Sequence, residues 1–251
     1  MRASDLGKIM ASASGIGKAY HAIISLYYGC SYYYYCLYVY PPLNSSDMRP
    51  EEREFGGDAK FLTMWCLFFQ MFYFFFSLFT DVVDLVTRDS KSSVTKYLIA
   101  IRDWFLCAVA FPIALVVVSM FWSLWSIDRQ LVFPKELDEY FPMWLNHVLH
   151  TYLLPILLVD MYIVKHKCPP RVFGLLGLFL VAALYLFWIL FLGFVKEIWV
   201  YPVLRVLEGA NFALFIVFVT VFPVPLYFFG ERLISFVNGP SQKVRPLQKK
   251  E

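Results

Sequence analysis

The sequence predicts an all-α polytopic membrane protein, a bundle of six transmembrane helices. Hydrophobic residues make up 60% of its 251 residues and charged residues only 16%, whereas a soluble domain is about half apolar and a quarter charged. The apolar residues gather in runs of about 20, the length that a helix needs to cross a bilayer. The segments between these runs are short, so we expect a single transmembrane domain over residues 1–251.

Six apolar runs are long enough to form one membrane-spanning helix each. Tyrosine favours the headgroup layer, so the run of tyrosines at residues 32–35 makes the first span the weakest. Prolines inside the runs are tolerated where neighbouring helices or polar side chains satisfy the freed carbonyls. The expected spans are residues 19–40, 61–85, 98–127, 142–164, 172–195 and 203–229.

The distribution of basic residues predicts the orientation, because cytoplasmic loops of membrane proteins are enriched in Lys and Arg. The two terminal segments and the loops after the second and fourth spans hold 15 of the 22 Lys and Arg residues. Both termini are therefore expected to be cytoplasmic. The net charge is only +3 and the basic residues form no single patch, which argues against a nucleic-acid partner.

The five cysteines are expected to be small buried hydrophobes. Their number is odd, their spacing is irregular and they contain no CxxC pair, which argues against a disulfide framework and against a zinc site. They are Cys30, Cys36, Cys66, Cys107 and Cys168.

Polar residues near the start of the fourth span are the least expected feature, because such groups are costly within a membrane and often functional. Asn146, His147 and His150 lie three or four residues apart and share one helical face. They could form a polar seam between helices, bind a metal, or supply a general base. Metal is the weakest alternative, since zinc needs at least three protein ligands. The other two alternatives stay open on chemistry alone.

Carboxylates at the other end of the spans are expected to be structural. Asp160 lies about 15 Å along the fourth helix from His150, near the cytoplasmic end, where we expect it to meet water. Asp81 and Asp84 lie near the cytoplasmic end of the second helix. They are expected to pair with Arg102 at the start of the third, because intramembrane charges usually pair.

Thr63 is a candidate partner for a histidine base. It opens the second helix, which starts from the same non-cytoplasmic side as the fourth, so the two sites are expected at similar depth. A threonine hydroxyl is a weak nucleophile until a base removes its proton. A Thr–His pair in a lipid-accessible pocket would suit ester cleavage. The competing interpretation is that Thr63 only bonds to its own helical turn.

Four stretches carry a resemblance to a known family. The most specific is residues 144–151, with the pattern W-L-N-H-x-x-H-T. Residues 56–63, 102–104 and 199–202 accompany it. Together they resemble the androgen-induced protein family, which includes the androgen-dependent regulator of tissue factor pathway inhibitor. The resemblance extends from about residue 56 to the end of the last span.

The resemblance implies a six-helix threonine hydrolase that cleaves fatty-acid esters of hydroxy fatty acids without a cofactor or metal. It implies that Thr63 is the nucleophile and His150 the base. Asn146 is a candidate oxyanion donor by its proximity in sequence, and His147 a possible supporting residue. The implied partner is a lipid ester that enters from the bilayer of the endoplasmic reticulum or cell membrane, and no protein partner is indicated. The alternative is a non-enzymatic lipid-binding or regulatory membrane protein.

Overall fold

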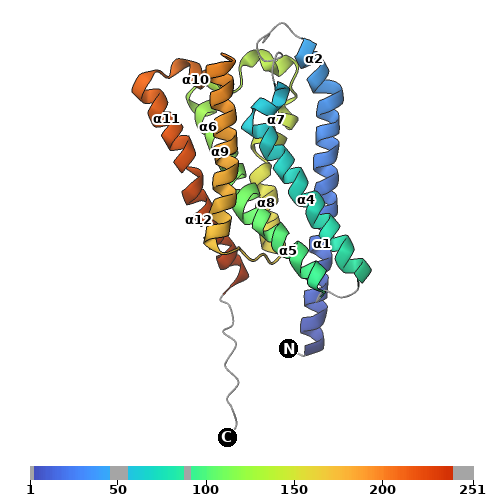
Figure 1. Ribbon diagram of the computed structural model, residues 1–251. Helices are drawn as coiled ribbons and strands as arrows, with labels where there is room; N and C mark the ends of the chain where they lie inside the picture. The colour runs from blue at the N-terminus through green and yellow to red at the C-terminus, as the bar shows by residue number, and fades with distance from the viewer. Residues whose placement is uncertain (1–2, 46–55, 88–91, 240–251) are drawn as a thin grey trace.

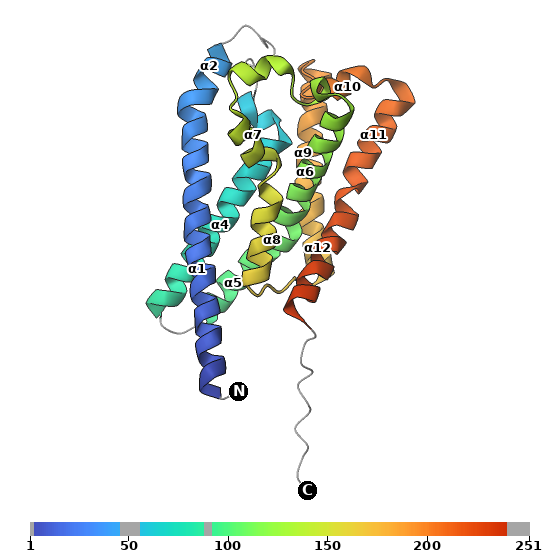
Figure 2. The same cartoon turned by 180° about the vertical axis from the view of Figure 1, so that it is seen from behind.

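Helices that run side by side make up most of the described part of the chain (Figure 1). The computed structural model describes residues 3–45, 56–87 and 92–239, and no strand occurs within these ranges. The all-α prediction is therefore confirmed for them. The first described helix begins, and the last one ends, at the same end of the bundle (Figures 1 and 2).

Four helical rods are long and apolar enough to cross a membrane. The first is α4 (Leu62–Thr87), and the third is α9 (Arg171–Val195). The second, residues 93–127, joins three elements end to end, and the fourth, residues 209–238, joins two. These elements are α5 (Ser93–Phe105), the π-helical η3 (Leu106–Ala110), α6 (Phe111–Ile127), α11 (Gly209–Val221) and α12 (Pro223–Asn238). They fit a membrane protein, and by length and composition they correspond to four of the six predicted spans.

The first predicted span lies within a longer helical rod. α1 (Ala3–Tyr34) continues through the π-helical η1 (Tyr35–Val39) into α2 (Tyr40–Ser45), so the rod extends beyond residues 19–40 at both ends. It runs along α4 in both views (Figures 1 and 2). It is not among the four rods that are long and apolar enough to span by composition.

The prediction of one continuous helix over residues 142–164 is wrong. The segment forms α7 (Met143–His150) and α8 (Leu153–Ile163), which are separated by a turn at Thr151 and Tyr152. Pro155 gives the physical reason, because it has no N–H for the carbonyl of the residue four positions earlier and its ring clashes with that carbonyl. The break places His150 at the last residue of α7.

The last predicted span, residues 203–229, also has different bounds. The short helix α10 (Pro202–Val206) is followed by two non-helical residues, and α11 then begins at Gly209. Gly209 has a φ of +53°, a left-handed conformation that glycine adopts without strain. The chain changes direction there before α11 and α12 return toward the other end (Figure 1). Three short 3₁₀ helices complete the fold: η2 (Gly57–Lys60), η4 (Arg129–Leu131) and η5 (Lys135–Glu139).

A set of buried ionisable side chains, called here the charge network, ties α1, α4, α5 and α8 together. Its members are His21, Asp81, Arg102, Asp103, Asp160 and His166. With both imidazoles protonated, the three carboxylates are balanced by three cations. A balanced network avoids the cost of an unpaired buried charge.

Asp160 lies at the centre of the charge network, so the expectation that it meets water is wrong. Its side chain is 0% exposed. His21 Nε2 and His166 Nε2 lie 2.9 Å and 3.1 Å from its carboxylate oxygens. The Tyr73 hydroxyl also donates a hydrogen bond to it. The packing of α1 against α8 encloses a residue that a single exposed helix end would leave in solvent.

The predicted pairing of Asp81 and Asp84 with Arg102 is also wrong. Asp81 Oδ2 lies 2.6 Å from His21 Nδ1, and Asp84 Oδ2 lies 2.6 Å from Lys18 Nζ. Both partners belong to α1, which packs along the face of α4 that carries these two carboxylates. Arg102 instead pairs with the neighbouring Asp103 at 2.8 Å.

Candidate active site

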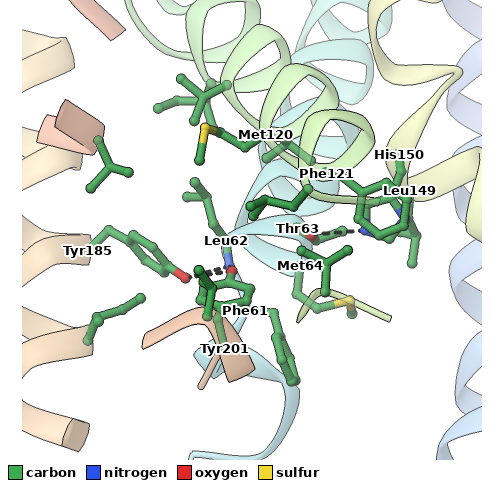
Figure 3. Close-up of a pocket in the computed structure, with 18 of the residues that line it drawn as sticks. Phe61, Leu62, Thr63, Met64, Met120, Phe121, Leu149, His150, Tyr185 and Tyr201 are labelled. Carbon is green, nitrogen blue, oxygen red and sulfur yellow. Dashed lines mark hydrogen bonds between the residues drawn. The ribbon is translucent and has the colours of Figure 1, made fainter. Parts of the chain in front are cut away.

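A largely apolar cavity of about 290 Å³ opens between α4, α6, α7, α9 and α11. Thr63 and His150 form one part of its wall, and the phenols of Tyr185 and Tyr201 form another (Figure 3). Most of the other lining side chains are aliphatic or aromatic, including Met120 and Phe121. A cavity of this kind, apolar with a few convergent polar groups, is typical of a small-molecule site.

Thr63 is held at the second residue of α4 by a tight turn that precedes the helix. Gly56 and Gly57 adopt φ values of +82° and +49°, and a Cβ on Gly56 would lie 2.9 Å from the Trp188 ring. Only glycine fits this turn without strain. Phe61 is then extended, and α4 begins at Leu62. The turn of residues 56–60 thereby presents the half-buried Thr63 side chain to the cavity.

The Thr63 hydroxyl faces the imidazole of His150 across the cavity wall. Thr63 Oγ1 lies 3.2 Å from His150 Nε2 (Figure 3). This distance is within the reach expected of a nucleophile and its base. The structure thus brings together two residues that are 87 positions apart in the sequence.

The surroundings of His150 determine which ring nitrogen carries the proton. Nδ1 lies 2.7 Å from Asn146 Oδ1 and 3.1 Å from the Asn146 backbone oxygen. Both oxygens can only accept, so Nδ1 donates and carries the proton. In the neutral ring, Nε2 then has the free lone pair and accepts from the Thr63 hydroxyl. This is the tautomer that a general base requires.

The His150 ring is held in place from two further directions. Phe121 stacks on it with ring centroids 3.6 Å apart and an interplanar angle of 11°. Trp122 Nε1 donates to the His150 carbonyl at 2.9 Å, which satisfies one of the carbonyls left open at the end of a helix. The aromatic pair on α6 therefore fixes both the ring and the backbone of this residue.

Asn146, His147 and His150 of the 144–151 motif have different surroundings. Asn146 is 1% exposed, lies behind His150 and does not line the cavity. His147 Nδ1 lies 3.0 Å from Thr151 Oγ1, and its ring stacks on Trp122. Of the three, only His150 reaches the cavity, and Asn146 contacts it as an orienting residue. Within the described ranges, no cluster of three His, Cys, Asp or Glu side chains suitable for a metal occurs.

Two tyrosines beside Thr63 were not predicted as site residues. The Leu62 N–H points to both phenol oxygens, at 2.8 Å from Tyr185 and 3.0 Å from Tyr201. Tyr185 lies in an apolar run that gives no functional signal. Tyr201 belongs to the 199–202 stretch, where an aromatic anchor at the membrane interface is expected in any case.

A further polar pair, Tyr35 and Asp58, lines the same cavity. The Tyr35 hydroxyl donates to the carboxyl group of Asp58, which lies in the η2 turn. Burial raises the pKa of Asp58 above its ordinary value, although the Tyr35 hydrogen bond and the nearby Lys60 oppose the shift. This contact joins η1 to the turn that positions Thr63.

Comparison with known proteins gives the family. The family described as FAR-17a/AIG1-like protein matches residues 20–235. The chain belongs to this family. It is 35% identical to human androgen-induced gene 1 protein over 75% of this chain and 81% of that protein. It is 31% identical to human androgen-dependent TFPI-regulating protein, over 88% of this chain and 97% of that protein. The rat protein of the same name is also 31% identical, over 90% of this chain and 95% of that protein.

The match to the FAR-17a/AIG1 family confirms the resemblance predicted from the four sequence stretches. The matched range contains Thr63, Asn146 and His150, the tyrosine pair and all of the charge network. The names of the relatives state no reaction. No solved structure matches the chain.

Proposed function

We propose that this protein is an intramembrane lipid ester hydrolase that cleaves fatty-acid esters of hydroxy fatty acids. The observation that carries the proposal is the contact of Thr63 Oγ1 with His150 Nε2 at 3.2 Å, at the wall of an apolar cavity. The Nδ1 proton on the Asn146 side supports it, because it leaves Nε2 free to act as a base.

The reaction begins when His150 Nε2 takes the proton of Thr63. Thr63 Oγ1 attacks the ester carbonyl, and the hydroxy fatty acid leaves with the proton that His150 returns to its oxygen. The fatty acyl group is now bound to Thr63. Water, deprotonated by the same nitrogen, attacks this acyl-threonine and releases the fatty acid, and His150 returns the proton to Thr63. Splitting one hydrolysis into two transfers is the general advantage of a covalent nucleophile.

The proposal includes a membrane arrangement. We place α1 and the α7–α8 pair in the bilayer beside the four apolar rods, which gives six spans. Both termini are cytoplasmic in this arrangement, which is supported by the start of α1 and the end of α12 lying at the same end of the bundle (Figures 1 and 2). Thr63 and His150 then lie toward the non-cytoplasmic leaflet. The lipid ester enters sideways from the endoplasmic reticulum or cell membrane.

Hydrolysis of a branched fatty-acid ester by membranes that carry matched amounts of each variant tests the proposal. Thr63→Ala and His150→Ala should each lose at least about 10³-fold in turnover, since nucleophile and base act as a unit. Thr63→Ser should retain activity, because it keeps the hydroxyl. Thr220→Val is the matched control: Thr220 lines the same cavity, but its hydroxyl is bonded to Ile216 of its own helix.

An inactive wild type, or full activity in Thr63→Ala, would contradict the hydrolase proposal. The alternative, a lipid-binding protein without catalysis, predicts instead that all four variants bind lipid and none turns it over. Mass spectrometry of denatured protein after brief exposure to substrate should detect the acyl group on the peptide that contains Thr63.

A further inference from the structure

Tyr185 and Tyr201 form a closed group of hydrogen bonds around the start of α4. The Tyr185 hydroxyl donates to the Lys60 carbonyl at 3.1 Å and lies 3.0 Å from the Tyr201 hydroxyl. The Leu62 N–H donates toward both phenols. Tyr185 comes from α9 and Tyr201 from the segment before α10, and both meet the backbone amide of Leu62, which is more than 120 positions earlier in the chain (Figure 3).

Counting protons distinguishes the two phenols. A phenol has one proton to donate. The proton of Tyr185 is directed to Lys60, so the hydrogen bond between the two phenols uses the proton of Tyr201. If Tyr201 turns its proton toward a ligand, Tyr185 keeps its donor contact to Lys60 and its acceptor contact from Leu62. No protein group then loses a partner that it needs.

The Tyr201 hydroxyl contacts the residue that directly precedes the nucleophile. Leu62 directly precedes Thr63, and consecutive Cα atoms are about 3.8 Å apart. Tyr201 and Thr63 both line the same cavity. An ester attacked by Thr63 can therefore direct its carbonyl oxygen toward the tyrosine pair, which lines the same cavity (Figure 3).

We propose that the Tyr201 hydroxyl donates the hydrogen bond that stabilises the oxyanion formed when Thr63 attacks an ester. This inference rests on the proposed hydrolase function and adds a catalytic residue to it. In the resting protein Tyr201 donates to Tyr185, and it transfers that hydrogen bond to the substrate oxygen as negative charge develops there. A hydrogen bond to a charged oxygen is about twice as strong as one between neutral groups, so the exchange favours the transition state.

Other polar groups near the reaction are less suited to this role. Asn146 does not line the cavity, although it was the donor suggested by the sequence. The Tyr35 proton is directed to Asp58, and the Thr220 proton to Ile216. Burial raises the pKa of Tyr201 above its ordinary value, so its phenol keeps the proton that it must donate.

Comparing an oxygen ester with its thiono counterpart tests the assignment, because a C=S sulfur is a poor hydrogen-bond acceptor. In Tyr201→Phe, kcat for the oxygen ester should fall roughly 10²- to 10³-fold, the usual cost of one oxyanion donor, while KM changes little. The rate on the thiono ester should stay near that of the wild type. Tyr40→Phe is the matched control, since it removes another phenol from the same cavity.

The ratio of the two rates separates chemistry from folding. A variant that is simply misfolded loses both reactions equally, and that result would overturn the assignment. So would a rise in KM confined to substrates with a free carboxylate, which would make Tyr201 an anchor for that group. If wild type does not hydrolyse the ester at all, the proposed function itself fails, an outcome distinct from unchanged activity in Tyr201→Phe, which removes only the role of Tyr201.

Discussion

Asn146 Oδ1 accepts a hydrogen bond from His150 Nδ1 at 2.7 Å, one helical turn along α7. Asn146→Ala removes the shorter of the two Nδ1 contacts and leaves only the backbone oxygen of residue 146 at 3.1 Å, so the orientation and tautomer of the imidazole are held less firmly. We expect kcat for ester hydrolysis to fall about 10²-fold, a typical effect of misplacing a catalytic group by 1 Å. Asn146→Asp, which keeps an oxygen acceptor, should restore much of the rate.

The neighbouring residue supplies the control for this prediction. His147→Gln removes an imidazole that contacts Thr151 and not the base, so its kcat should stay close to wild type. Equal losses in Asn146→Ala and His147→Gln would show that the motif only holds helices together.

The break between α7 and α8 should be required for activity rather than for stability. Pro155→Ala restores an N–H and removes the ring clash, so the two helices can join. Because a continuous helix would redirect His150, we expect turnover to fall at least about tenfold. The unfolding temperature in detergent should stay the same or rise. Pro170→Ala, at the start of α9, is a control that should leave turnover unchanged.

The charge network should dominate the stability of the bundle. Asp160→Asn removes the anion that faces His21 and His166, and breaking such a buried pair costs about 3–5 kcal/mol. Asp138→Asn breaks the surface pair with Arg129. Because the Asp138 side chain is 46% exposed, this change should cost less than about 1 kcal/mol. Denaturant unfolding in micelles measures both, and similar losses in the two variants would contradict the predicted hierarchy.

Stability should also fall as the pH rises, because of His166. Burial lowers the pKa of His166, but its contacts with Asp103 and Asp160 outweigh burial and raise the pKa above the ordinary value, with Arg102 opposing them. Because the pKa of His166 is raised in the folded protein, the stability that its proton contributes is fully present below the unfolded-state pKa of about 6.5. That stability is lost as the pH rises through the folded-state pKa.

The measurement is the unfolding temperature of wild type and His166→Gln between about pH 6 and pH 9. The unfolding temperature of the wild type should decrease more over this pH range than that of the variant. Parallel curves would show that His166 does not bind its extra proton in the folded state.

The helical class and the long apolar rods could be predicted because their signals are local. A run of about 20 apolar residues indicates a span wherever it occurs, and α4 and α9 have nearly the predicted bounds. Thr63 and His150 could be proposed together because both follow short polar stretches on the same predicted side. The contact between them could be established only from the structure, since no sequence pattern in one segment gives its distance to another segment.

The remaining features depend on contacts between distant segments. Nothing near Asp160 in the sequence indicates that His21, 139 residues earlier, would cover it. Tyr201 resembles an interfacial anchor until its contact with Leu62 is seen. Pro155 lies within an apolar run of the sequence, but whether it bends or breaks a helix depends on what packs around the opened turn.

The charge network has a consequence for how the protein is made. Its members extend from His21 to His166, so more than half of the chain must leave the ribosome before the last one is available. An unpaired charge within a bilayer costs about 2.5–3.5 kcal/mol on insertion scales. In the proposed membrane arrangement, helices α1, α4 and α5 enter the bilayer with polar groups that still lack their final partners, and we expect the insertion machinery to shelter them until α8 arrives. Truncated nascent chains that end before His166 should be retained by membrane chaperones and degraded.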